Sequence, residues 1–140
     1  MEYGIIYLKV CPPSGHHSEW MKHCFVNSEL ALDDRNKIDE ISSGINSKYA
    51  SDIIIPMDSK LHPGCVCTTD SVRKIATEMY NGYVSFFESK LGIECVRCVY
   101  SVGEISDVNV KSTHYLGYDD VVIKVGRFLD SSDETGLFKI

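Results

Sequence analysis

The cysteines are the residues of this chain best suited to chemistry, and four of them form two close pairs. The pairs lie in the segments 65–67 (C-V-C) and 95–98 (C-V-R-C). Four thiolates can close a tetrahedral zinc site, and two separated pairs are a common form of structural zinc site. The second pair, however, lies in a β-branched run, and residues three apart in a regular strand point to opposite faces. We therefore expect buried thiols and no cofactor. The alternative is zinc held by Cys65, Cys67, Cys95 and Cys98.

A second group of reactive residues lies near the N-terminus. It comprises Cys11, His16, His17, His23 and Cys24. A cysteine nucleophile needs a histidine within reach in space and a third group that orients it, and nearness in sequence supplies neither. The chain also lacks a glycine-rich phosphate loop and the HExxH, GxSxG and kinase motifs. The pattern favours a protein without catalysis and leaves open a small enzyme that uses Cys and His residues.

The segment 113–120, T-H-Y-L-G-Y-D-D, is the best candidate for a contact loop. Tyrosine favours binding surfaces because its ring is apolar and its hydroxyl is hydrated. The expected contact residues are Tyr115, Tyr118, Asp119 and Asp120. The alternative is a hairpin loop with one or two rings packed into the core.

The charge of the chain restricts its partners. Its 14 basic and 20 acidic residues give a net charge of −6, whereas proteins that bind nucleic acid directly normally carry a basic excess. Paired carboxylates recur at 33–34, 39–40, 119–120 and 133–134, which is compatible with mimicry of nucleic acid and also with simple solubility. No apolar run reaches the roughly 20 residues that span a membrane, and no signal peptide is evident, so we expect a cytoplasmic protein.

One long helix organises the expected fold. In the stretch 70–92, apolar residues recur at helical spacing, Asp70 is a candidate N-cap, and Gly92 can end the helix in the left-handed conformation. A second helix is expected to begin at Asp33 or Asp34. The segment 16–32 fits either a short helix or an irregular strand. Strands are expected over 3–10, 53–57, 65–69, 93–102 and 121–128, followed by a mobile tail over 130–140.

This order predicts a single α+β domain over 1–140. Two helices would cover one face of a mostly antiparallel sheet, in the ferredoxin-like βαββαβ order with an extra C-terminal strand. Such a fold hosts many activities and fixes none of them.

The composition and the absence of catalytic motifs favour a small acidic binding protein. We expect it to dock on another macromolecule and inhibit or modulate it, with a protein as partner. A viral, phage or mobile-element inhibitor of a host nucleic-acid or defence enzyme would fit this description. The alternatives are the small enzyme or zinc-binding domain, and a homo-oligomeric sensor or sequestering protein for a small molecule.

Overall fold

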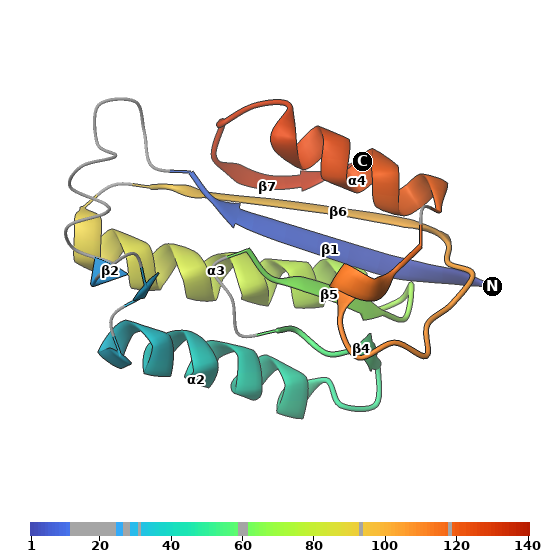
Figure 1. Ribbon diagram of the computed structural model, residues 1–140, viewed down its shortest axis with the longest axis horizontal. Coiled ribbons are helices and arrows are strands. Elements are labelled where there is room, and N and C mark those ends of the chain that lie inside the picture. The colour runs from blue at the N-terminus through green and yellow to red at the C-terminus, as the bar shows by residue number, and fades with distance from the viewer. Residues whose placement is uncertain (12–24, 27–28, 31, 59–61, 93, 118) are drawn as a thin grey trace.

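The computed structural model describes residues 1–140 except 12–24, 27–28, 31, 59–61, 93 and 118. Its elements follow the chain in this order: β1 (Glu2–Val10), β2 (Phe25–Val26), β3 (Glu29–Leu30), α2 (Leu32–Lys48), β4 (Ile53–Ile55), β5 (Gly64–Cys67), α3 (Val72–Leu91), β6 (Val96–Glu104), the 3-10 helix η1 (Thr113–Tyr115), α4 (Asp120–Asp130) and β7 (Gly136–Lys139) (Figure 1). The expected α+β class is confirmed.

Five strands form one mixed sheet in the order β4-β5-β1-β6-β7. The central strand β1 pairs antiparallel with β5 and with β6, and β4 pairs antiparallel with β5. Strand β7 lies parallel to β6 at one edge. The β1–β6 register runs from Glu2 opposite Glu104 to Val10 opposite Val96. The short hairpin β2–β3 precedes α2, and α4 precedes β7, so the element order departs from the expected one.

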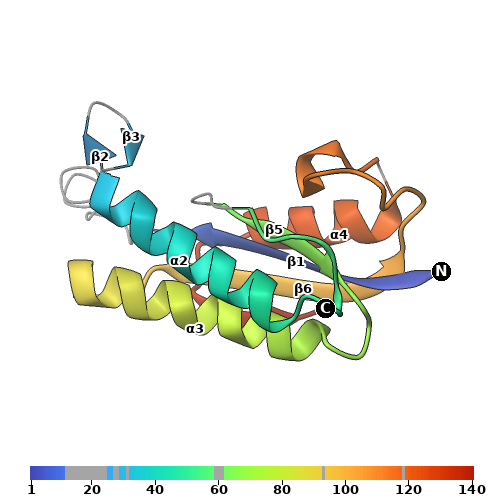
Figure 2. The ribbon, with the colours of Figure 1, turned by 90° about the horizontal axis from the view of Figure 1, so that it is seen from below.

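Helices cover both faces of the sheet (Figure 2). Successive strand residues point to opposite faces, so β1 sends Ile6 and Leu8 to one side and Ile5 to the other. The first core lies under α2 and α3 and includes Ile38, Met79 and buried cysteines. The second lies under α4. The two expected helices do share one face, but the expected number of helices is wrong, because α4 is a third α-helix among the described residues and covers the other face.

Helix α3 forms where the sequence predicts it. Its apolar side contributes Ile75, Met79, Tyr83 and Phe87, which are all fully buried. Gly92 ends the helix with φ 71°, and its N–H donates to the carbonyl of Glu88 at 2.8 Å, as the C-cap prediction requires. The N-cap is not Asp70 but Ser71, whose side chain makes no capping hydrogen bond.

The strand expected over 121–128 is wrong, because this segment forms α4. β-Branched residues favour a strand, but Val121, Val125 and Leu129 recur every fourth residue and bury one side of a helix. The segment has a place to pack as a helix because β6 carries Gly103 opposite its first turn. A Cβ atom added to Gly103 would lie 2.6 Å from Cβ of Val121.

The expected tail over 130–140 is wrong as well, because it contains β7. Its register on β6 runs from Gly136 opposite Arg97 to Lys139 opposite Tyr100, and Ile140 extends the pairing by donating to the carbonyl of Tyr100 at 3.0 Å.

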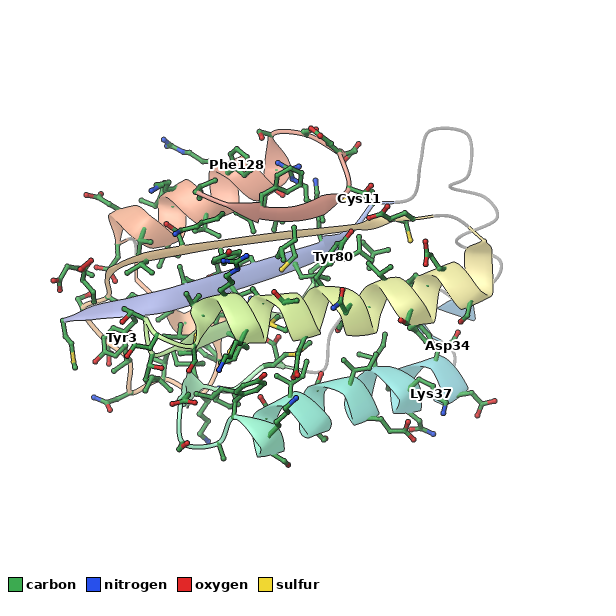
Figure 3. All side chains as sticks on the ribbon, turned by 180° about the vertical axis from the view of Figure 1, so that it is seen from behind. Tyr3, Cys11, Asp34, Lys37, Tyr80 and Phe128 are labelled. Carbon is green, nitrogen blue, oxygen red and sulfur yellow. The ribbon has the colours of Figure 1, made fainter. Side chains whose placement is uncertain are left out.

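Arg97 connects this C-terminal region to the sheet through hydrogen bonds and ring contacts. Its side chain is 2% exposed, and its Cζ lies 4.8 Å from the ring centre of Phe128 and 4.5 Å from that of Phe138. Its Nη1 donates to the carbonyl of Glu134 at 2.8 Å, and its Nη2 to that of Phe128 at 2.9 Å. Figure 3 labels Phe128 on α4. One buried cation thus joins β6, the end of α4 and the start of β7.

None of the helices in the described part of the chain is long and apolar enough to cross a membrane.

Candidate functional site: a cationic groove beside helix α3

The four paired cysteines lie in one core, on the side of the sheet that α3 covers. All four are fully buried, and burial raises the pKa of the Cys65, Cys67 and Cys98 thiols, that of Cys67 to about 12. A thiol that keeps its proton is a poor nucleophile and a poor metal ligand. These residues therefore contribute as small apolar side chains.

The expectation that Cys95 and Cys98 point to opposite faces is wrong. Strand β6 begins only at Val96, so Cys95 lies outside the regular strand and both thiols reach the same core. Across the described residues, no three His, Cys, Asp or Glu side chains are arranged to hold a metal ion. The zinc alternative thus gains no geometric support.

The predicted contact loop separates into parts with different surroundings. Tyr115 lies on η1 and is 71% exposed, as a contact residue would be. Asp119 instead anchors the chain, because its Oδ2 accepts hydrogen bonds from the Ser106 amide at 3.0 Å and the Ser106 hydroxyl at 3.2 Å. Asp120 is exposed at the start of α4. Tyr118 lies outside the described residues.

The reactive residues near the N-terminus fall mostly outside the described residues, which exclude His16, His17, His23 and Cys24. Cys11 is described and buried, and burial raises the pKa of its thiol. A buried, protonated thiol does not point to nucleophilic catalysis.

A different feature has the properties of a binding site, and we call it the α3 groove. It is a groove of about 680 Å³ between the first turns of α3 and the strands β6 and β7. Its lining consists of Thr69, Val72, Arg73, Thr77, Tyr100, Val102, Leu137 and Lys139.

The start of α3 is placed here by close packing on β1. A Cβ atom added to Gly4 would lie 2.5 Å from Cβ of Val72, so glycine lets the first turn of α3 approach the sheet. The first turn has no acidic residue and no side-chain cap. The amides at this helix terminus carry partial positive charge, which favours an anion nearby.

Two cations flank the groove without partners of their own. Neither Arg73 nor Lys139 makes a side-chain hydrogen bond or ion pair with any described residue, and no carboxylate lines the groove. Three other grooves in the described part of the chain each include at least one carboxylate, from Glu78, Glu104, Asp119 or Asp120. Positive charge is thus left unbalanced in the α3 groove.

The hydroxyl of Tyr100 is a further polar group that a ligand in the groove could contact. The residue is only 6% exposed, and among the described residues its side chain has no hydrogen-bond partner. The described side-chain atoms that are both fully buried and unpartnered are Thr68 Oγ1 and Arg97 Nε, so the Tyr100 hydroxyl must retain some access to solvent. Because Tyr100 lines the α3 groove, that access opens into it. Buried polar groups normally have a partner, and here water or a ligand in the groove can supply it.

Sequence reasoning missed this groove. The only local signal is the beginning of α3, where Ser71, Val72, Arg73 and Lys74 include basic residues and no acidic one. Tyr100 and Lys139 become neighbours through the parallel pairing of β6 with β7. The sequence did not predict this pairing, because residues 130–140 were expected to form a tail.

Neither a protein-family model nor a curated protein matches this chain. The groove must therefore be interpreted from its own chemistry.

Proposed function

We propose that this protein is a binding protein that holds an anionic group of its ligand or partner, a phosphate or a carboxylate, in the α3 groove. The single observation that carries the proposal is the unpartnered, largely buried Tyr100 side chain in a groove lined by two free cations and no carboxylate. Arg73 and Lys139 would supply charge, Tyr100 a hydroxyl donor, and the first turn of α3 its amides.

The wider proposal is the one that the composition favours: a cytoplasmic, non-enzymatic protein that docks on another macromolecule and modulates or inhibits it, with a host nucleic-acid or defence enzyme as target. The α3 groove supports this proposal by offering a place to grip an acidic group of such a partner. The exposed ring of Tyr115 offers a second contact.

We also propose that the part of the fold from β1 to β6 is a ferredoxin-like unit extended by α4 and β7. The neighbours β4-β5-β1-β6 and their antiparallel pairings support this assignment. The hairpin β2–β3 and helix α4 are additions to it.

The test is a titration of the isotope-labelled protein with inorganic phosphate and with succinate, followed by amide chemical shifts. We expect shifts at the amides of Val72, Arg73 and Lys139. We also expect Arg73→Gln, Lys139→Gln and Tyr100→Phe each to weaken binding by about threefold to tenfold, since each removes one charged or polar contact. Lys111→Gln, which removes an exposed cation outside the groove, is the matched control and should leave the affinity unchanged.

If Lys111→Gln and Arg73→Gln weakened anion binding equally, the anion would be responding to any surface cation and not to the α3 groove, and the proposal would fail. The absence of shifts in the groove with both anions would also contradict it.

A further inference from the structure

Strand β7 presents a free edge next to the α3 groove. Within the described sheet it has β6 as its neighbour on one side and no strand on the other. The Ile140 amide donates to the carbonyl of Tyr100, so the amides of Leu137 and Lys139, one position out of phase, point away from β6. Backbone groups on such an edge are ready to pair with another extended chain.

A second groove lies on the other side of this edge, and we call it the α4 groove. It has a volume of about 590 Å³. Its lining consists of Asp120, Ile123, Lys124, Arg127, Phe128, Ser131 and Ile140. The two grooves differ in chemistry. The surface of the α4 groove is mainly apolar, and its cations Lys124 and Arg127 are accompanied by the carboxylate of Asp120. The α3 groove combines apolar side chains with hydroxyls and two cations and has no carboxylate.

The side chains of β7 alternate between the two grooves. Leu137 and Lys139 line the α3 groove, whereas Phe138 and Ile140 belong to the core under α4, and Ile140 lines the α4 groove. A chain added beside β7 would alternate in the same way, since neighbouring strands share the same pleat. Every second side chain would meet the cations of the α3 groove, and those between would meet the apolar α4 groove.

We propose that β7 binds an extended peptide segment of a partner as an additional strand, and that this segment alternates acidic and apolar residues. The inference rests on the proposed function and deepens it, because it assigns the anionic group to carboxylate side chains of a peptide. A lysine on an edge strand can by itself serve to discourage aggregation, but Arg73 and Tyr100 lie off that strand and have no such role.

A second copy of this chain fits the edge less well. If two copies of β7 paired so that their α3 faces lay on the same side of the joined sheet, Lys139 and Arg73 of both copies would share that side. If one copy were inverted, Lys139 would approach the Lys124 and Arg127 of the other. Like charges across paired strands destabilise either arrangement.

The experiment measures binding of three capped peptides longer than β7. The first alternates Glu and Val, the second has the same composition with all Val residues before all Glu residues, and the third alternates Lys and Val. We expect the first peptide to bind at least about tenfold more tightly than the second and the third to show no binding. Equal binding of the first two peptides would overturn the proposal.

Two variants separate edge pairing from anion binding. Leu137→Pro removes an outward amide and keeps both groove cations, and Leu137→Ala is its matched control because it removes the same side chain but keeps the amide. Because Leu137 lines the α3 groove, the two variants are compared with each other. We expect them to give equal phosphate-induced shifts at Arg73, and only Leu137→Pro to lose the peptide. If the peptide bound both variants equally while phosphate still bound, the edge proposal would fail and the anion proposal would stand.

A measurement on the unmodified protein tests the proposal even if the proline variant does not fold. The bound Glu-Val peptide should slow hydrogen exchange at the amides of Leu137 and Lys139, which then donate to the added strand. Unchanged exchange at both amides in the complex would contradict the proposal. A dimer in sedimentation without peptide that is lost in Leu137→Pro but kept in Leu137→Ala would do so too, since it would show a second copy on this edge.

Discussion

The two faces of the sheet carry different helices, but on each face a glycine of the sheet allows a helix to make a close contact. Helices α2 and α3 lie on one side and α4 alone on the other (Figure 2). On the α3 face, Gly4 of β1 allows close contact with Val72 in the first turn of α3. On the α4 face, Gly103 of β6 allows the same contact with Val121. Since Gly103 lies opposite Tyr3, the residue before Gly4, the two contacts occur at one end of the same strand pair.

The faces differ in how they use positive charge. On the α4 face, Arg97 contacts the rings of Phe128 and Phe138 and has both terminal nitrogens hydrogen-bonded to carbonyls. On the α3 face, Arg73 and Lys139 have no partner among the described residues and flank a groove. Arg97 therefore serves the structure, whereas Arg73 and Lys139 are free to bind a ligand. This contrast predicts that stability and binding can be altered separately.

The largest effect is expected from Arg97→Met. The substitution leaves the carbonyl of Glu134 without its side-chain donor and removes two ring contacts, while the carbonyl of Phe128 keeps the Ser131 hydroxyl at 2.8 Å. We therefore expect the free energy of unfolding to fall by about 3 kcal/mol. Urea unfolding measures this loss. Arg73→Gln is the comparison from the other face and should change stability by less than about 0.5 kcal/mol. Equal losses in the two variants would remove the distinction between a structural and a free cation.

Gly4→Ala and Gly103→Ala test whether the two helices are seated alike. Each added methyl group would overlap a valine Cβ atom, at 2.5 Å and 2.6 Å respectively, so we expect each variant to lose about 2 kcal/mol. Gly126→Ala is the matched control, since nothing lies within 4 Å of the added carbon there. A loss confined to one face would show that only one helix depends on its glycine.

How far the sequence could predict the two faces depended on which interactions fix each helix. The pattern of α3 and its Gly92 cap are local, so the helix and its end were predicted correctly. Helix α4 has a β-branched sequence, and its conformation depends on a contact with Gly103 that periodicity does not reveal. The α3 groove was missed because Arg73, Tyr100 and Lys139 come together only once β7 is placed beside β6. Tertiary pairing, not propensity, creates that site.

The buried thiols of the α3 face predict a dependence of stability on alkaline pH. Burial is the main cause that raises the pKa of Cys67 from 9.0 to about 12, with Asp52 adding to it. Between these values the folded state keeps a proton that the unfolded state releases. The stabilisation is therefore complete below about pH 9 and declines as the pH rises, by about 1.4 kcal/mol per pH unit for this thiol.

Urea unfolding at a series of pH values across this window measures the decline. Cys67→Ala should show a shallower loss of stability. Its strand neighbour Val66 points to the α4 face and does not titrate, so Val66→Ala should lower stability by the same amount at each pH. An unchanged slope in Cys67→Ala would mean that another group governs the alkaline loss.

The smallest effects are expected from one surface ion pair on each side of the molecule. Lys9 Nζ lies 3.2 Å from Asp133 Oδ1 and ties β1 to the loop between α4 and β7, and its side chain is 16% exposed. Lys48 pairs with Glu78 between α2 and α3, where the lysine is far more exposed. Each pair has one strongly exposed partner, since the side chain of Asp133 is 84% exposed and that of Lys48 is 62% exposed. Water screens both pairs, so double-mutant cycles should give less than about 1 kcal/mol for each. A larger coupling for Lys48–Glu78 would mean that the docking of α2 on α3 relies on charge, whereas the apolar contact of Ile41 with Gly82 indicates that it relies on packing.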